Sequence, residues 1–293
     1  MSAVKKAVIP AAGLGTRMLP ITHAVPKEML PIVDCPAVYY LVKEAVDSGI
    51  TDILIITGRD KEAMENFFDH SPEYDAALTA KGKTEWVDQL HAIAGMANIH
   101  FIRQKEARGL GHAIGCARAF VGSDPFAVLY GDDVIFSRRP VCAQMIESYE
   151  KYGRPVVGLK HVPLCDIGKY CSMKAEAIPG SDTEFLVTGM VEKPKPEQVM
   201  SDMAILGRVL LEPEIFDRID HLTPGAGGEI QLTDAMCQIA EERGMTGLVF
   251  EGERFDLGSK LGWLMANVTQ GMLHREVGED FRRFLLDFAE TLR

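Results

Sequence analysis

The stretch Val8–Pro36, V-I-P-A-A-G-L-G-T-R-M-L-P-I-T-H-A-V-P-K-E-M-L-P-I-V-D-C-P, decides the fold. It begins with the apolar residues of a predicted buried strand and then breaks into a turn that contains Gly13 and Gly15. Two glycines two residues apart let backbone N–H groups face a bound anion without interference from a Cβ atom. Arg17 follows as a permanently charged, planar donor suited to phosphate oxygens. The stretch is therefore predicted to be a phosphate-binding loop.

Two common kinds of phosphate loop do not fit this stretch. A Walker A loop needs Gly-Lys followed by Ser or Thr, and no such run occurs within it. A dinucleotide fingerprint needs a third glycine where Met18 stands, although Asp34 lies near the distance expected for its acid. Three prolines also interrupt the segment that would form the crossover helix, at positions 20, 26 and 31. A proline-rich loop that closes over a ligand, with a second cation at Lys27, fits better.

The composition restricts the class of protein. The chain has 293 residues, of which 47% are hydrophobic and 25% charged, values typical of a globular α/β protein. Its formal charge of −11 argues against a nucleic-acid partner or an anionic membrane surface. No apolar run approaches the roughly 18 residues that span a bilayer. The six cysteines show no C-x-x-C pair, so we expect reduced thiols and a cytoplasmic location.

Apolar and amphipathic segments alternate along the chain and predict an α/β fold. Residues 37–48 are predicted to form a helix and residues 53–57 a strand, which with the first strand gives a βαβ unit. Residues 111–121, with His112 as a helix-start residue, and residues 230–243 are also predicted to be helices. Residues 74–97 are predicted to be an insert, either a lid or a surface excursion. An apolar stripe along residues 281–292 predicts a terminal helix that packs on its own core or on another subunit.

Carboxylates follow two predicted strands. Asp132 and Asp133 come after the apolar run 125–130, and Asp256 follows a shorter one. In α/β sheets ligands bind at the carboxyl ends of the strands, and Mg²⁺ that serves phosphates prefers one or two carboxylates. Asp132 is therefore a candidate magnesium ligand. For this residue taken alone, the equal alternative is that it is an acid in a turn and caps the next segment.

Five motifs, in order along nearly the whole chain, resemble those of the bacterial sugar-1-phosphate nucleotidylyltransferases. The resemblance is strongest to their UTP–glucose-1-phosphate uridylyltransferase branch, also called UDP-glucose pyrophosphorylase. The motifs are G-x-G-T-R-x-x-P with P-K-E-M-L-P, G-D-D at 131–133, V-E-K-P at 191–194, the run 224–234 (P-G-A-G-G-E-I-Q-L-T-D), and F-D-L-G at 255–258.

The resemblance implies a fold and a division of the chain. The fold is a three-layer α/β/α sandwich with a mixed, mostly parallel sheet, of the Rossmann-like nucleotide-diphospho-sugar transferase type. Residues 1–258 would form the catalytic domain, with its sugar-facing part at about 155–258. Residues 259–293 would form a helical segment that contacts other subunits in a homodimer or homotetramer.

The resemblance also implies the reaction and its partners. UMP would pass from UTP to α-D-glucose 1-phosphate, giving UDP-glucose and pyrophosphate, with Mg²⁺ held by Asp132 and Asp256. Arg17, Lys27 and Lys193 would contact the phosphates. The nucleotide would be bound by the main chain or side chains of Ala12, Gly13, Gly15, Glu28, Gln104 and Gly109. The sugar would be bound by Cys171, Glu192 and Lys193.

Two departures from the family pattern bear on specificity. Most members carry Lys where this chain has His23, which removes a fixed positive charge near the phosphates. Members usually have glycine where this chain has Cys171, so a Cβ and a sulfur enter the predicted sugar site. A thymidylyltransferase or another sugar specificity stays open as an alternative. A nucleotide-sugar sensor without activity and an NAD-dependent oxidoreductase are the other classes to test.

Overall fold

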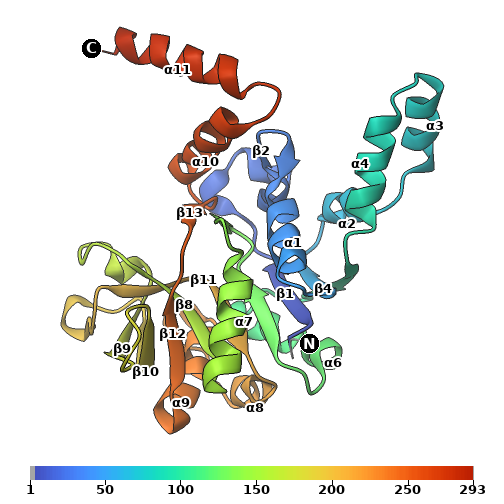
Figure 1. Cartoon of the computed structure of the whole chain (residues 1–293). Coiled ribbons are helices and arrows are strands. Elements are labelled where there is room, and N and C mark those ends of the chain that lie inside the picture. The colour runs from blue at the N-terminus through green and yellow to red at the C-terminus, as the bar shows by residue number, and fades with distance from the viewer. Residues whose placement is uncertain (1–3, 293) are drawn as a thin grey trace.

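The computed structural model describes residues 4–292, and a nine-stranded sheet forms its centre (Figure 1). Seven strands run in one direction, whereas β10 and β11 run against their neighbours. In sheet order the strands are β5 (Asn98–Arg103), β4 (Asp52–Thr57), β1 (Lys6–Ala11), β6 (Phe126–Leu129), β11 (Met203–Leu211), β8 (Val156–His161), β12 (Met245–Val249), β10 (Glu184–Glu192) and β9 (Cys171–Ala177).

Helices cover both faces of this sheet. Along β1, Ala7 and Ile9 belong to the hydrophobic core on one face, whereas Val8 belongs to the core on the other. This alternation follows from the two-residue period of a strand that is buried on both sides. The helices of the first face are α1 (Ala37–Asp47) and α7 (Val141–Tyr152), and those of the second are α5 (Leu110–Gly115), α8 (Glu214–Asp220) and α9 (Leu232–Arg243). The predicted three-layer, mixed and mostly parallel fold is confirmed.

The loop after β1 is made of single turns, not of a crossover helix. Three 3₁₀ turns follow one another, η1 (Thr16–Met18), η2 (Ile21–His23) and η3 (Lys27–Met29). Prolines precede the second and third turns, where they set φ and interrupt any continuous helix. Two short antiparallel sheets flank the main sheet, β2 (Pro31–Ile32) with β3 (Cys35–Pro36), and β7 (Asp133–Phe136) with β13 (Glu253–Asp256).

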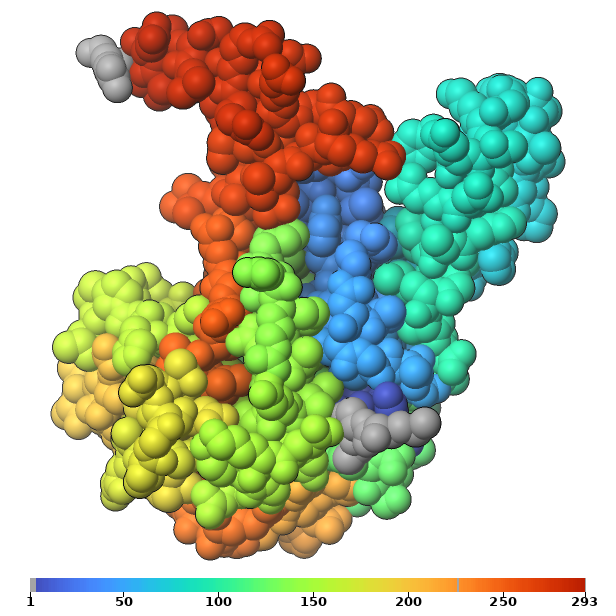
Figure 2. Space-filling model, in the orientation of Figure 1, coloured from blue at the N-terminus to red at the C-terminus, as the bar shows by residue number. Residues whose placement is uncertain are grey.

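Two pairs of helices stand out from the body of the molecule (Figures 1 and 2). The insert predicted at 74–97 is a helical hairpin, α3 (Pro72–Ala80) with α4 (Thr84–Ala94), which follows α2 (Glu62–Phe68). The second pair is α10 (Lys260–Leu273) with α11 (Gly278–Thr291). No helix among residues 4–292 is long and apolar enough to cross a membrane. The predicted domain boundary at residue 258 stays a prediction.

Some predicted elements differ from the structure. The helix predicted at 111–121 is broken into α5 and α6 (Arg118–Val121), with Gly115, a weak helix former, at the break. The helix predicted from Ile230 begins at Leu232, because the backbone of Ile230 is hydrogen-bonded to Arg108 and Gly111. A tertiary contact therefore removes two residues that the periodicity assigns to the helix.

Arg208 on β11 is a fully buried cation at the centre of the sheet. Its Nε and Nη2 donate to the carboxylate of Glu44 on α1 at 2.9 and 2.7 Å. Its Nη1 donates to the carbonyls of Asp133 and Gly207 at 2.9 and 2.8 Å. The side chain thus joins α1, β7 and β11.

Replacing Arg208 with Met is expected to lower the free energy of unfolding by about 3–5 kcal/mol, because the Glu44 carboxylate would stay buried without its partner. Urea denaturation measures the loss. Lys43→Met is the matched control, since Lys43 sits beside Glu44 on α1 but is half exposed and pairs only with Asp47. The control should cost about 0.5 kcal/mol or less. A similar cost for both variants would contradict the role of Arg208.

Candidate active site

The predicted site residues gather around two adjoining cavities at the ends of β1 and β6. The loop cavity, of about 280 Å³, is lined by Ala12, Gly13, Lys27, Gln104, Gly109 and Asp132, among others. The second cavity, of about 160 Å³, is lined by Cys171, Glu192, Thr233 and Arg254, among others. The two share Leu110 and Tyr130 in their walls. The fold therefore brings together residues that are far apart in the sequence, such as Ala12 and Arg254, which are 242 positions apart.

Two cations and two carboxylates meet at the mouth of the loop cavity. Lys27 Nζ lies 2.9 Å from Asp132 Oδ2, and Arg17 Nη2 lies 3.3 Å from the same oxygen. Arg17 Nη1 also lies 3.6 Å from Asp256 Oδ2. Arg17 is largely exposed and Lys27 largely buried, so the arginine is the freer of the two to turn toward a ligand.

The pairing of β7 with β13 places Asp256 next to Asp132. Asp256 stands opposite Asp133 in this antiparallel pair, and the Leu257 N–H donates to the Asp132 carbonyl at 2.8 Å. The Gly258 N–H donates to Asp256 Oδ1 at 2.8 Å and so orients that carboxylate. A Cβ on Gly258 would lie 2.5 Å from Arg17 Nη2, so any larger residue there would displace the guanidinium from its present position.

The residues at this point suit a divalent cation that substrate oxygens complete. Among residues 4–292, no group of three or more His, Cys, Asp or Glu side chains could hold a metal by itself. Asp132 and Asp256, however, both reach Arg17 with hard carboxylate oxygens. Mg²⁺ in phosphate-transfer sites is usually bound by one or two carboxylates together with substrate phosphates and water. The donor set therefore fits magnesium bound with a nucleotide.

The charges of this cluster support one another. Burial raises the pKa of Asp132, but Lys27 and Arg17 outweigh it and hold the pKa below its usual value. Burial lowers the pKa of Lys27, but Asp132 and Glu28 outweigh it and raise the pKa. Asp133 differs, because burial raises its pKa to about 6 although Arg254 opposes the shift. Asp132 is thus ionised at neutral pH, and Asp133 is held inward by Arg254 Nε at 2.6 Å.

The far end of the loop cavity presents an amide and glycine backbone. Gln104 is almost buried, and its Nε2 lies 2.8 Å from His112 Nδ1, which orients the amide. Gly109 has a φ of 104°, and a Cβ there would lie 2.7 Å from the Ile230 carbonyl oxygen. Only glycine both adopts this φ without strain and leaves room for the Ile230 carbonyl oxygen. His112 was predicted only as a helix-start residue, and its contact with Gln104 depends on the fold of the loop between them.

Three other predicted residues lie around the loop. Gly15 adopts a φ of 66°, and its carbonyl accepts a hydrogen bond from Thr22 Oγ1 at 2.9 Å. Glu28 is fully buried behind the loop and does not line the loop cavity. His23 ends η2 with an exposed side chain that does not line the cavity either.

Of the V-E-K-P motif, Glu192 lines the second cavity, and Lys193 does not. Glu192 is the last residue of β10, and its Oε2 accepts a hydrogen bond from Thr233 Oγ1 at 2.9 Å. Lys193 has a φ of 45°, rare for a residue with a side chain, so the two side chains need not point to opposite faces as in a continued strand. Lys193 is exposed, and no salt bridge among residues 4–292 joins it to a carboxylate.

Cys171 lies in the wall of the second cavity. Its side chain is 4% exposed, and burial raises its pKa far above the usual range, so it is a neutral thiol. Thr233 and Arg254 were not predicted as site residues. A threonine and an arginine carry no signal of their own in a sequence, and only the fold shows that they hold Glu192 and Asp133.

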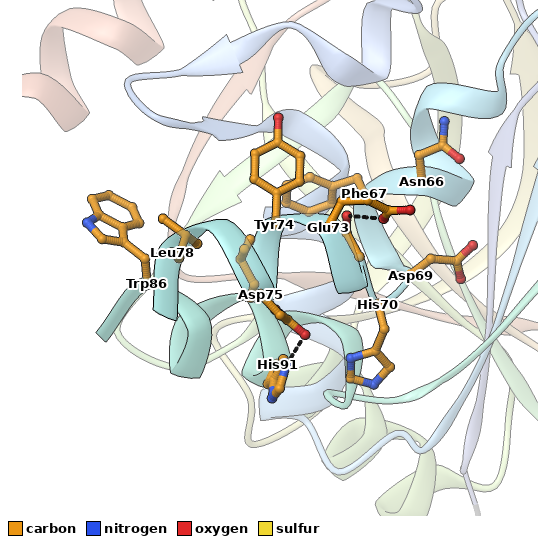
Figure 3. A pocket seen from close by; sticks show the side chains of 12 residues that line it. Asn66, Phe67, Asp69, His70, Glu73, Tyr74, Asp75, Leu78, Trp86 and His91 are labelled. Carbon is orange, nitrogen blue, oxygen red and sulfur yellow. Dashed lines mark hydrogen bonds and ion pairs between the residues drawn. The ribbon is translucent and has the colours of Figure 1, made fainter. Parts of the chain in front are cut away.

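A larger cavity of about 570 Å³ lies apart from this site, between α2 and the hairpin of α3 and α4 (Figure 3). Phe67, Tyr74 and Trp86 line it, and His91 Nε2 lies 2.8 Å from Asp75 Oδ2 in its wall. None of the predicted site residues lines this cavity.

The chain resembles known proteins over nearly its whole length. UTP–glucose-1-phosphate uridylyltransferase YngB of Bacillus subtilis is 48% identical over 284 residues, which cover 97% of this chain and 95% of that protein. A second UTP–glucose-1-phosphate uridylyltransferase of B. subtilis is 44% identical over 285 residues, 97% of each chain.

Solved structures agree with these relatives. A UDP-glucose pyrophosphorylase complexed with UDP-glucose superposes with a TM-score of 0.83 at 38% identity, covering 91% of this chain and 98% of that one. The UTP-bound UGPase from Acinetobacter baumannii superposes with a TM-score of 0.87 at 34% identity, covering 97% and 99%. The family model described as nucleotidyl transferase matches residues 6–269. The chain therefore belongs to the nucleotidyl transferase family.

Proposed function

We propose that this protein transfers UMP from UTP to α-D-glucose 1-phosphate and releases UDP-glucose and pyrophosphate. The observation that carries the proposal is the cluster of Asp132, Asp256, Arg17 and Lys27 beside the two cavities. Lys27 and Asp132 line the loop cavity, and Asp133, the chain neighbour of Asp132, lines the second cavity. One cavity suits a nucleotide and the other a sugar, so their phosphates would meet at this cluster. The relatives named as UTP–glucose-1-phosphate uridylyltransferases support this choice of substrates.

The reaction is an in-line displacement. An oxygen of the sugar phosphate attacks the α-phosphorus of UTP, and the bond from that phosphorus to the bridging oxygen breaks as pyrophosphate leaves. A phosphate monoester oxygen is already a competent nucleophile, so no general base is required. Positioning of the two substrates and neutralisation of their charge account for the acceleration.

The cations of the site divide this task. Arg17, which is exposed and reaches both carboxylates, neutralises the leaving pyrophosphate. Lys27, which is largely buried, contacts the phosphates near the α-position. Lys193 holds the phosphate of the sugar, and its lack of a carboxylate partner among residues 4–292 leaves it available for this contact.

Asp132 and Asp256 would hold Mg²⁺. The metal would supply charge neutralisation between the two phosphate groups when bound. In the structure Arg17 and Lys27 compensate the charge of the carboxylates. If the carboxylates had a metal ion as their partner instead, both cations would be free to contact substrate oxygens. The ionised state of Asp132 at neutral pH suits it to this exchange.

The base and the sugar have their own contacts in this proposal. Gln104 and the backbone of Ala12, Gly13 and Gly109 read the uracil edge, with Gly15 and Glu28 supporting the loop. Glu192 accepts hydrogen bonds from sugar hydroxyls, held in place by Thr233. Cys171 narrows the sugar end of the second cavity, which favours a second candidate function, uridylyl transfer to a different sugar phosphate.

The face of α11 is proposed to join subunits in a homodimer or homotetramer. Phe281, Phe284 and Phe288 stack along it, and Phe284 and Phe288 are about half exposed. An apolar stripe of this kind on a helix that stands out from the body normally contacts a partner. The cytoplasmic location stays a prediction, supported by six free cysteines in the described chain.

A pyrophosphate-release panel tests the proposed reaction. UTP and dTTP are crossed with the 1-phosphates of glucose, galactose and N-acetylglucosamine, with and without Mg²⁺. We expect UTP with glucose 1-phosphate and Mg²⁺ to give the highest kcat/KM. A preference for dTTP would indicate a thymidylyltransferase, another preferred sugar would support the Cys171 alternative, and UDP-glucose binding without turnover would indicate a sensor.

Asp132→Asn should lower kcat at least about 100-fold, because the substitution removes the charge of a carboxylate that would bind the metal and that pairs with Lys27. Steady-state pyrophosphate release at increasing Mg²⁺ measures the effect, and the thermal midpoint verifies folding. Asp124→Asn is the control, since Asp124 is half exposed and pairs with Lys6 away from the site. Near-normal turnover by folded Asp132→Asn would remove Asp132 from the metal site.

The double substitution Phe284→Glu with Phe288→Glu should shift the protein to a smaller species, because two charges would be placed in an apolar contact. Sedimentation velocity measures the species over a range of concentrations. Glu290→Lys, an exposed charge change on the same helix, should leave the species unchanged. An unaltered oligomer in the double variant would exclude this face as the contact.

A further inference from the structure

The turn at residues 58–61 lies directly beneath the loop that carries Ala12 and Gly13. A Cβ on Gly58 would lie 3.0 Å from the Ala12 carbonyl oxygen, which shows how closely the two backbones approach. Asp60 adopts a φ of 58°, a left-handed conformation that is rare outside glycine. The backbone turns at Asp60, and the next side chain, Lys61, is directed back under the loop.

Lys61 is almost completely buried and uses all three of its N–H donors. Its Nζ contacts the Ala11 carbonyl oxygen, lies 2.9 Å from the Gly13 carbonyl oxygen and lies 2.9 Å from Glu28 Oε2. An ammonium group has three donors, so these acceptors saturate it. Burial lowers the pKa of Lys61 and raises that of Glu28, and each group opposes the shift of the other.

The two carbonyls fix the orientation of two peptide planes. In a trans peptide the C=O and the following N–H point in opposite directions. Because Lys61 holds the carbonyls of Ala11 and Gly13 from below, the N–H groups of Ala12 and Leu14 are turned to the opposite side of the loop. Ala12 and Gly13 line the loop cavity, whereas neither Lys61 nor Glu28 does.

Glu28 connects this arrangement to the cation cluster. Its side chain is fully buried, and one carboxylate oxygen, Oε1, has no hydrogen-bond partner among the described residues. Its chain neighbour Lys27 contacts Asp132 at 2.9 Å. A carboxylate this deeply buried depends on its remaining partner, and Lys61 is the cation that holds it.

We propose that Lys61 is a positioning residue for the nucleotide. From behind the loop it holds the peptides at residues 11–14 and the side chain of Glu28 in the geometry that binds the uridine end of UTP. It touches no substrate. This inference rests on the proposed nucleotide site in the loop cavity. The second cavity is not part of it, since no hydrogen bond or ion pair joins Lys61 to the described residues that line that cavity.

Lys61→Met tests the proposal in the full chain, since Met keeps the length of the side chain and removes all three donors. The KM for UTP, and its Kd measured by calorimetry, should rise about 10- to 100-fold, the usual effect of losing hydrogen bonds to a charged group. The KM for glucose 1-phosphate at saturating UTP should stay within about twofold, because the sugar cavity is untouched. Lys61→Arg should not restore UTP binding, because a planar guanidinium cannot place three donors at one point.

Lys81→Met is the matched control. Lys81 is an exposed lysine in the connection between α3 and α4, and its substitution should change neither KM. If the single variant Lys61→Met fails to fold, the double variant Lys61→Met with Glu28→Gln is compared with the single variant Glu28→Gln. Glu28→Gln removes from both proteins the buried carboxylate that would lack a partner without Lys61. The KM for UTP should again rise in the variant that lacks Lys61.

Two outcomes would overturn the proposal. One is a folded Lys61→Met protein whose KM for UTP stays within about twofold of the parent, a change too small for a lost hydrogen bond. The other is an equal rise in both KM values, which would show a purely structural role. The variant Gln104→Ala shows whether the role of Lys61 or the proposed nucleotide site itself is wrong. If Gln104→Ala raises the KM for UTP and Lys61→Met does not, only the role of Lys61 is refuted. No effect of either variant would refute the nucleotide site.

Discussion

The buried guanidinium of Arg208 is the interaction on which the geometry of the site depends. It binds Glu44 of α1 and the carbonyls of Gly207 and Asp133, so it joins a helix of one layer to β11 and to the start of β7. Because an unpaired buried charge costs several kcal/mol, these three elements must come together. Once β7 is placed, its pairing with β13 brings Asp256 beside Asp132.

The site itself is a set of charges that compensate one another. The chain carries a net charge of −11, and yet two cations contact Asp132. In the proposed reaction, a magnesium nucleotide would bring both the metal for the carboxylates and the phosphates for the cations. Lys193 differs from Arg17 and Lys27 in having no carboxylate partner among the described residues, which agrees with a role toward the second substrate.

Much of the architecture could be predicted from local patterns. The apolar strands, the proline-rich loop after β1 and the strand that ends before Asp132 all follow from periodicity and from backbone restrictions of single residues. The start of α9 at Leu232 could not, because it depends on backbone hydrogen bonds from Ile230 to a segment far away in the chain. Likewise, Thr233 and His112 acquire a role only through the residues they orient, Glu192 and Gln104.

The amino-acid sequence alone reveals the chemical inventory of this protein: a glycine turn with Arg17, the cation at Lys27, the acids Asp132 and Asp256, and the family to which such motifs point. These are local properties, set by residue type and spacing. Only the tertiary structure decided that Asp256 lies beside Asp132, that Glu28 lies behind the loop cavity and not in its wall, and that Lys61 binds the loop from below. Such contacts join residues separated by dozens of positions, and burial and charge pairing select them only when the sheet has formed.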